Sequence, residues 1–288
     1  MGSLSKKLGQ LAALSLESES SQILRTIKPN KVPNSLSQRL DTTLKESHDM
    51  KVFGMGTLAS MANKQRYVRF TTSLYGVYST MEDEMDKCCV QSTSNSLGNE
   101  NLSEHSESDT EQNSPVAHFW NKHSEILRRA EHLRRDISAL TDNDLGKDYS
   151  YSQPTLNYMN AIKDAGDQDR RDGTGRLLGH AYTRYLADLM GGQVLGTPTR
   201  LALRMEEGMP QQYSFSFPTD RKSYVESIYH DFNESGKMMN DDVVILEEVA
   251  EEARAAFRHN INVYGEEPLI LDSLLGLKNI ATGYCFHR

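Results

Sequence analysis

Apolar side chains recur along most of this chain at the three- and four-residue spacing of a helix that buries one face. The clearest run covers residues 63–87, where the apolar positions are Tyr67, Phe70, Leu74, Val77, Met81 and Met85. No segment shows the alternation of β-branched and polar residues that indicates a strand. The pattern therefore predicts an all-α fold.

Periodicity, together with the positions of glycine and proline, also predicts where the other helices lie. They are expected over residues 35–52, 115–140, a short segment from about 154, 178–193, 197–207, 219–233 and 240–264. Two glycine-rich segments, residues 53–56 and 173–175, are interpreted as helix breaks. Thr197 is expected to cap a helix whose first position is Pro198 and which Gly208 closes.

The segment GHAYTRYLADLMGGQ, residues 179–193, carries two different faces. Leu178, Tyr182, Tyr185 and Leu189 form an apolar stripe that is expected to pack into the core. A second face has almost no side-chain bulk, because it is made by Thr183, Ala187 and Gly191. Arg184 and Asp188 lie four residues apart beside this bare strip. Such a strip allows another group to approach the backbone closely.

Two polar residues fall on otherwise apolar helix faces. His48 follows Leu40 and Leu44 at four-residue spacing, and Asn260 continues a stripe that contains Phe257. A lone histidine in such a place is more often a core residue than a ligand. A buried amide must find hydrogen-bond partners, so Asn260 is the more informative of the two.

Composition narrows the classes of function. The 288 residues carry a net charge of −8, which lacks the basic excess of nucleic-acid-binding proteins. Three cysteines, two of them adjacent, do not suggest a disulfide framework. No apolar run is long enough to cross a membrane, so we expect a soluble, cytoplasmic protein.

Composition also suggests how the chain is divided. Residues 1–34 are predicted to be a mobile tail and residues 266–288 a C-terminal extension. Between them lies one domain, residues 35–265, interrupted by a polar, disordered insertion at 91–114. The arginines at 128, 129, 134 and 135 are expected to face outward, either as a solvated face or as a docking patch for an acidic partner.

Common metal-site motifs are missing. The sequence contains no HExxH, no Cys-x-x-Cys and no Glu-x-x-His of the di-iron helical bundles. Chemistry based on those centres is therefore disfavoured.

Four segments, in order along the chain, resemble the haem oxygenase family. GHAYTRYLADLMGGQ is similar to the distal helix of that family, and LKESH to its proximal-histidine helix. SLYGVYSTMEDEMD and AAFRHNIN resemble two further core helices. The resemblance implies a single all-α domain that holds haem between a proximal and a distal helix. It also implies oxidative opening of haem to biliverdin, carbon monoxide and ferrous iron, using dioxygen and reducing equivalents.

The resemblance assigns roles to individual residues. His48 becomes the proximal iron ligand, for which a neutral imidazole is suited. Tyr78, Arg184, Asp188 and Asn260 become a distal hydrogen-bond network that holds ordered water and supports catalysis. The remaining residues expected against the haem are Tyr182, Ala187, Gly191, Lys45, His230 and Phe257. Electrons are expected from NADPH through a reductase or from a ferredoxin, and the protein is expected to be a monomer.

Some positions depart from the family pattern. Ala187 stands where a glycine is usual, and Asp41, Glu226 and His230 stand where basic residues pair the haem propionates. These departures support an alternative hypothesis, a non-catalytic relative that binds haem or lacks it and acts as a sensor or scaffold. The retained His48, with the distal residues, favours the enzyme.

Overall fold

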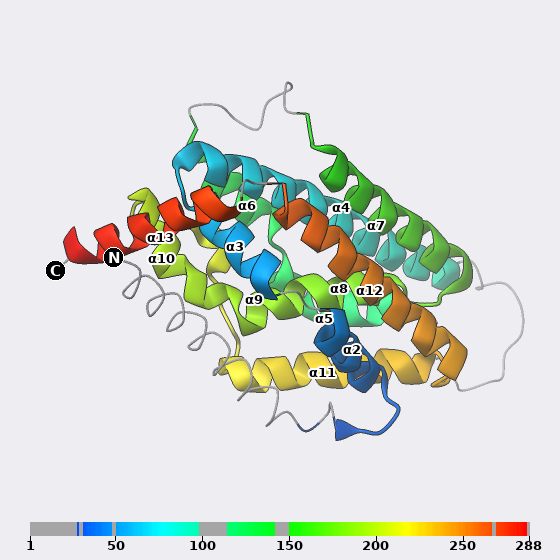
Figure 1. Cartoon of the computed structure of the whole chain (residues 1–288). Coiled ribbons are helices and arrows are strands. Elements are labelled where there is room, and N and C mark those ends of the chain that lie inside the picture. The colour runs from blue at the N-terminus through cyan, green and yellow to red at the C-terminus, as the bar shows by residue number, and fades with distance from the viewer. Residues whose placement is uncertain are drawn as a thin grey trace, which may run out of the picture.

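A computed structural model of the chain describes residue 28 and residues 31–47, 50–97, 114–141, 150–266 and 269–286. All regular structure within those ranges is helical, and they contain no strand. The prediction of an all-α fold is therefore confirmed. Figure 1 shows the helices as a bundle in which segments far apart in sequence lie side by side.

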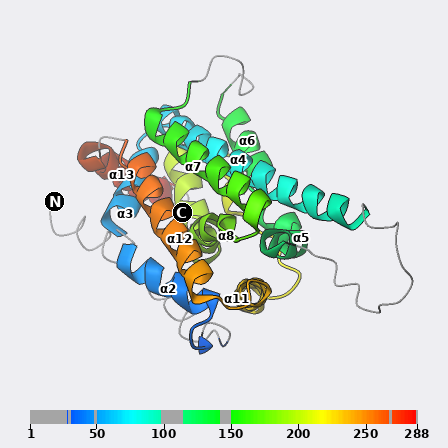
Figure 2. The same cartoon turned by 90° about the vertical axis from the view of Figure 1, so that its right-hand side faces the viewer.

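Two long helices run together along one side of the molecule (Figures 1 and 2). They are α4 (Lys64–Leu97) and α7 (Gln153–Asp172). Their close approach depends on Gly166, because a Cβ there would lie 2.6 Å from Glu84 Oε2. Helix α4 confirms the predicted helix over residues 63–87 but continues into the first residues of the predicted insertion. The rest of that insertion, residues 98–113, lies outside the described residues.

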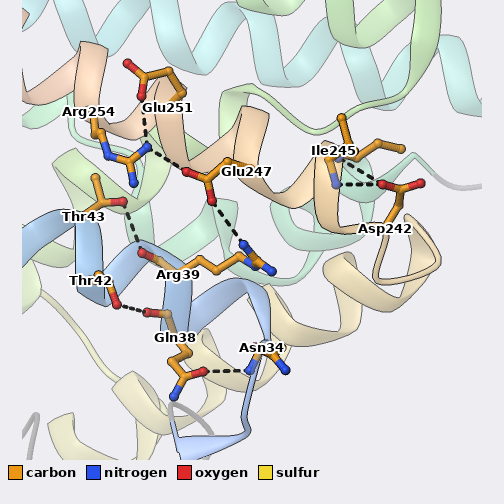
Figure 3. A network of polar contacts seen from close by, with 11 residues as sticks. Asn34, Gln38, Arg39, Thr42, Thr43, Asp242, Ile245, Glu247, Glu251 and Arg254 are labelled. Atoms are coloured by element: carbon orange, nitrogen blue, oxygen red, sulfur yellow. Dashed lines mark hydrogen bonds and ion pairs between the residues drawn. The ribbon is translucent and has the colours of Figure 1, made fainter.

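Helix α2 (Leu36–Ser47) packs beside α12 (Val243–Tyr264), with Leu36 and Leu40 fully buried in the core. One ion pair joins the two helices. Figure 3 shows Glu247 between two arginines, 3.1 Å from Arg39 Nη1 of α2 and 2.9 Å from Arg254 Nη1 of α12. Arg254 also pairs with Glu251, on the same helix, at 2.9 Å. Exposed pairs of this kind contribute little, so the buried leucines hold most of this contact.

The N-terminal helix expected over residues 35–52 is described in two parts, on either side of residues 48 and 49. Helix α3 (Met50–Ser60) follows α2, and the predicted break at residues 53–56 lies inside it. That prediction is wrong because Gly56 serves helix packing and not a turn. A Cβ at Gly56 would lie 2.7 Å from the carbonyl oxygen of Tyr264 on α12. Residues 48 and 49, and with them His48, lie outside the described residues.

The helix expected over residues 115–140 is also two, α5 (Pro115–Leu127) and α6 (Ala130–Ser138). Arg128 leaves the helical region with φ −53° and ψ 126°. Glu82 of α4 then accepts hydrogen bonds from the main-chain nitrogens of Arg129, at 2.6 Å, and Ala130, at 3.0 Å. A carboxylate from another helix therefore stabilises the start of α6. Arg129 is 3% exposed, so the prediction that it faces outward is wrong.

The later helices follow the predictions more closely at their middles than at their ends. Gly173 and Gly175 have φ of 68° and 72°, which confirms the break before residue 176. Helix α10 (Gly196–Leu203) begins before Thr197, which is therefore not its cap, and ends before Gly208. Helix α11 (Arg221–Met238) is capped by Asp220 and α12 by Asp242.

A last helix, α13 (Leu269–Phe286), was not predicted and occupies most of the expected C-terminal extension. It lies across α3 and α10 at one edge of the molecule (Figure 1). Asn279 donates hydrogen bonds to the carbonyl oxygens of Met61, at 3.1 Å, and Ala62, at 2.9 Å. Among the described helices, none combines the length and the apolar character needed to span a bilayer. Most of the predicted tail, residues 1–27, falls outside the described part of the chain, so the division into domains stays a prediction.

Candidate active site

A cavity of about 320 Å³ lies between α2, α3, α4, α11, α12 and the segment that begins at Tyr182. Most of its lining is apolar and comes from several helices, including Leu44, Phe53, Leu74, Leu186, Met190 and Phe257. A pocket of this kind, with a few polar groups at one wall, is typical of a binding site for an organic ligand.

The segment from residue 177 to residue 195 forms one wall and is not a uniform α-helix. It passes from α8 (Leu177–Ala181) through a π-helix, η2 (Tyr182–Leu186), to α9 (Ala187–Met190) and a 3₁₀ turn, η3 (Gly192–Leu195). Wider π turns of this kind often occur at functional sites. The predicted apolar stripe is confirmed, because its four residues are at most 2% exposed. The bare strip of Thr183, Ala187 and Gly191 lines the cavity.

Four polar side chains meet on the same wall. Arg184 donates from Nη1 to Asn260 Oδ1 at 2.8 Å and from Nη2 to the Tyr78 hydroxyl at 2.9 Å. Tyr78 in turn donates to Asp188 Oδ2. The structure thus brings together the residues predicted from the resemblance, one each from α4, η2, α9 and α12.

Burial controls the protonation of this network. It raises the pKa of Tyr78 well above the ordinary value, so the phenol keeps its proton at neutral pH. Burial also raises the pKa of Asp188, and the positive charge of Arg184, the hydrogen bond from Tyr78 and the charge of Arg129 oppose that rise. A carboxylate so balanced, at the end of a chain of hydrogen bonds, can accept or release a proton.

The other residues predicted to contact the ligand are divided between cavity and surface. Tyr182 and Phe257 line the cavity. Tyr182 donates its hydroxyl hydrogen to Asp41 Oδ1 at 2.5 Å, and Tyr229 donates to the same oxygen at 2.8 Å. Lys45 and His230 are exposed and do not belong to the lining.

The residues that sequence reasoning missed include Arg129, Gln212 and Tyr213, which also line the cavity. The last two belong to a short 3₁₀ turn, η4 (Gln211–Tyr213), which Asp136 holds by accepting from the main-chain nitrogens of Gln211 at 2.6 Å and Gln212 at 2.9 Å. Burial raises the pKa of Asp136 to about 6. No periodic pattern marks this turn in the sequence. A prediction that the helix is interrupted at Arg128 would have indicated that Arg129 can turn toward the cavity.

Glycine keeps parts of the cavity open. Gly54 and Gly191 both line it, from α3 and from the end of α9. A Cβ on Gly54 would have no neighbour within 4 Å, and one on Gly191 would touch only the carbonyl oxygen of Ala187, at 3.5 Å. The missing Cβ atoms therefore leave space that a ligand can fill. The described residues contain no group of three or more His, Cys, Asp or Glu side chains placed to hold a metal ion.

Comparison with known proteins identifies relatives along most of the chain. A family model described as "Heme oxygenase" matches residues 99–266. Heme oxygenase 1 of the cyanobacterium Synechocystis is 26% identical over 239 residues, which is 81% of this chain and 84% of that protein. Heme oxygenase 2 of the rat is 26% identical over 237 residues, which is 80% of this chain but only 65% of the rat protein.

Solved structures share the fold. A crystal structure of heme oxygenase 2 from Chlamydomonas reinhardtii, without heme, is 20% identical with a TM-score of 0.62 and covers 82% of this chain and 99% of its own. Heme oxygenase-1 from Synechocystis, in complex with heme, is 23% identical with a TM-score of 0.58 and covers 88% of this chain and 97% of its own. At these identities the likeness establishes a common fold.

Proposed function

Because the chain belongs to the haem oxygenase family, we propose that it opens haem oxidatively to biliverdin, carbon monoxide and ferrous iron. One observation carries the proposal beyond family membership. The network of Tyr78, Arg184 and Asn260, all buried, with the half-buried Asp188 stands on one wall of a mostly apolar cavity. Buried polar groups are costly, so a set of four with matched partners suits a site for proton transfer.

The residues present fit haem as the substrate. The cavity offers apolar side chains for a porphyrin face, and the positions of Gly54 and Gly191 leave room beside the backbone. The bare strip lets α9 approach a flat ring closely. When bound, haem supplies both the iron that activates dioxygen and the ring that is opened.

His48 is the proposed iron ligand. The side chain of Leu44, one turn earlier in the sequence, lines the cavity, and so does that of Phe53, five residues later. The sequence around His48 therefore borders the site on both sides. A neutral imidazole is a common ligand of haem iron.

The proposed role of Asp188 is to hold an ordered water and to pass a proton through it. Tyr78 stabilises the ionised carboxylate by donating to Oδ2, and Arg184 keeps Tyr78 in place. Asn260 fixes the other arm of the guanidinium. In a buried site these fixed dipoles act more strongly than they would in water.

A second candidate, a haem-binding protein that does not catalyse, is favoured by two observations. Ala187 places a methyl group in the bare strip, where it lines the cavity. The buried Asp41 takes the hydroxyl hydrogens of Tyr182 and Tyr229, so those hydrogens are not offered to a propionate. The retained buried network favours the enzyme.

Haem titration followed by turnover separates the two functions. Purified protein is titrated with haem and the Soret band is recorded; a reductant and air are then added, and biliverdin is measured by its visible spectrum. The enzyme should first give the Soret band of histidine-bound haem. After the reductant is added, this band should disappear as the absorption of biliverdin appears. A band that bleaches without bilin would contradict the oxygenase and leave the haem-binding protein.

A pair of histidine variants tests the ligand. His48→Ala should lose the normal Soret band, whereas His118→Ala, on α5 and away from the cavity lining, should keep it. An unchanged band in His48→Ala would show that another group binds the iron.

The electron donor is proposed to be a reductase that uses NADPH or a ferredoxin, acting on a cytoplasmic monomer. The arginines expected to form a docking patch are partly neutralised, because Arg134 and Arg135 pair with Glu131 at 2.8 and 2.9 Å. Supplying each donor separately and comparing the biliverdin rates identifies the one that the protein accepts.

A further inference from the structure

Tyr213 is a tyrosine of the cavity lining for which the proposed function has given no role. It lies in η4, and its side chain is half-buried. Within the described part of the chain, no group forms a hydrogen bond with its hydroxyl. Three other tyrosines of the lining, Tyr78, Tyr182 and Tyr229, donate their hydroxyl hydrogens to carboxylates. A phenol inside a protein usually has such a partner, so the Tyr213 hydroxyl can donate to a ligand.

The Tyr213 ring lies beside Asp188 on the cavity wall. The two side chains meet at Gly192, which also lines the cavity. A Cβ on Gly192 would lie 3.5 Å from Asp188 Oδ1 and 3.5 Å from Tyr213 Cδ1. A single methyl group would therefore touch both the carboxylate and the ring. Asp188 accepts from Tyr78 through Oδ2, so Oδ1 is its oxygen atom on the side of Tyr213.

Hydrogen bonds on both sides of Tyr213 fix its position before a ligand binds. Gln212 donates from its main-chain nitrogen to Asp136 Oδ2 at 2.9 Å and from Nε2 to the Tyr67 hydroxyl at 2.5 Å. The main-chain oxygen of Ser214 accepts from Arg129 Nη1 at 2.6 Å. These contacts hold the main chain around Tyr213 without using its hydroxyl, which reduces the entropy lost when a ligand binds there.

Tyr213 keeps its hydroxyl hydrogen at neutral pH. Burial raises the pKa of Tyr213 well above the ordinary value, and the negative charge of Asp188 adds to that rise. The hydroxyl is therefore a hydrogen-bond donor. A phenylalanine would fill the same space in the lining, so packing alone does not account for the hydroxyl.

We propose that Tyr213 contacts the ligand directly: its hydroxyl donates a hydrogen bond to the oxygen atom of the small molecule that binds beside Asp188 when haem occupies the cavity. This role rests on the proposed function, because it requires haem in the cavity. A fixed donor in an apolar site stabilises negative charge that develops on such an oxygen atom. Tyr78 acts there only through Asp188, whereas Tyr213 acts on the ligand itself.

Carbon monoxide is the probe for this hydrogen bond. The haem complex is reduced and exposed to carbon monoxide, and the C–O stretch is recorded by infrared spectroscopy. A donor that faces the oxygen atom of bound carbon monoxide lowers this frequency. Tyr213→Phe removes the donor and keeps the ring, so the stretch should move to higher wavenumber. Biliverdin formation should slow about tenfold, the effect of losing roughly one hydrogen bond.

Tyr224→Phe is the matched control. The Tyr224 hydroxyl is buried and has no hydrogen-bond partner within the described residues, but Tyr224 does not belong to the cavity lining. Its loss should change neither the C–O stretch nor the rate. In urea denaturation of the haem-free proteins, Tyr213→Phe should be as stable as wild type, because its hydroxyl makes no structural contact.

The outcomes separate the role of Tyr213 from the proposed function. A C–O stretch at the wild-type position in Tyr213→Phe would overturn the role of Tyr213, even where biliverdin forms. A shifted stretch in this variant, together with a wild-type protein that forms no biliverdin, would support that role and contradict the enzyme. A wild-type protein that gives no Soret band with haem would contradict both.

Discussion

Two regions of the molecule are built on different principles. In the first, Arg184 links Tyr78 and Asn260, and each of these side chains is at most 3% exposed. The second lies on α2 and α11, outside the cavity lining, at the positions where the sequence resemblance predicts bases. Its residues are Asp41, which is buried and accepts from two tyrosines, Glu226, which is half-buried, and His230, which is exposed. We call these regions the polar wall, which also includes Asp188, and the rim, which also includes the exposed Lys45.

This difference predicts what each region tolerates. Removing one partner from a buried network leaves another polar group unsatisfied, which costs about 1–3 kcal/mol, so members of the polar wall depend on each other. An exposed charge contributes about 0–1 kcal/mol and can change without disturbing its neighbours. Substitutions should therefore have large effects in the polar wall and small effects at the exposed positions of the rim.

The largest expected effect comes from Asp188→Asn in the polar wall. The amide keeps the size of the side chain but is a poor proton acceptor, so the rate of biliverdin formation should fall roughly 100-fold or more. The haem dissociation constant should change little. Glu226→Gln at the rim is the matched comparison and should change the rate by less than about threefold. Similar rates for both variants would remove the distinction between the two regions.

Two glycines in the segment of residues 177–195 have different roles. One allows close helix packing, and the other leaves space for a ligand. A Cβ at Gly179 would lie 2.7 Å from Val249 O and 2.8 Å from Ala253 N on α12, so Gly179→Ala should lower the free energy of unfolding by about 1–3 kcal/mol. Gly191→Ala meets no such clash and should leave unfolding unchanged.

Haem titration of Gly191→Ala tests the second role, the space left for a ligand. The Gly191→Ala methyl group would occupy ligand space, so haem affinity should fall roughly tenfold. Urea denaturation of the haem-free proteins and Soret titration measure the two effects. If Gly191→Ala bound haem as tightly as wild type, the bare strip would not be the contact surface.

Asp136→Asn tests how η4 is held against the cavity. Burial raises the pKa of Asp136 to about 6 from 3.8, so between these pH values the folded protein binds more protons than the unfolded chain. The free energy of unfolding should therefore fall by roughly 3 kcal/mol as the pH rises from 3.8 through about 6. Asp136→Asn should flatten that dependence, measured by urea denaturation at several pH values.

Burial also raises the pKa of Asp169 to about 6. Part of the pH dependence of the free energy of unfolding should therefore remain in Asp136→Asn. The same slope in Asp136→Asn as in wild type would show that Asp136 does not carry the dependence.

The smallest effects are expected at the rim. Lys45→Gln removes an exposed charge and His230→Gln an exposed imidazole, both outside the cavity lining, so haem affinity should fall by less than about threefold. Soret titration at low and high salt measures this effect. A loss of tenfold or more would show that the rim binds the propionates as strongly as the family pattern predicts.

The sequence by itself determined the all-α fold, the buried stripe that includes Tyr182 and Leu189, and the identity of the polar wall. The fold and the stripe depend on local periodicity. The polar wall, whose residues run from Tyr78 to Asn260, was assigned by the resemblance of separate segments to one family. A helix face can be recognised from its own residues, because its side chains repeat every three or four positions.

Only the tertiary structure decided where helices are interrupted and which further residues reach the cavity. Glu82 starts α6 from another helix, Tyr264 explains why Gly56 lies inside a helix, and Asp136 holds η4. These contacts join residues 48 to 208 positions apart, and no local pattern records them. Arg129 is the clearest case, since its burial depends on a helix break that a distant carboxylate stabilises.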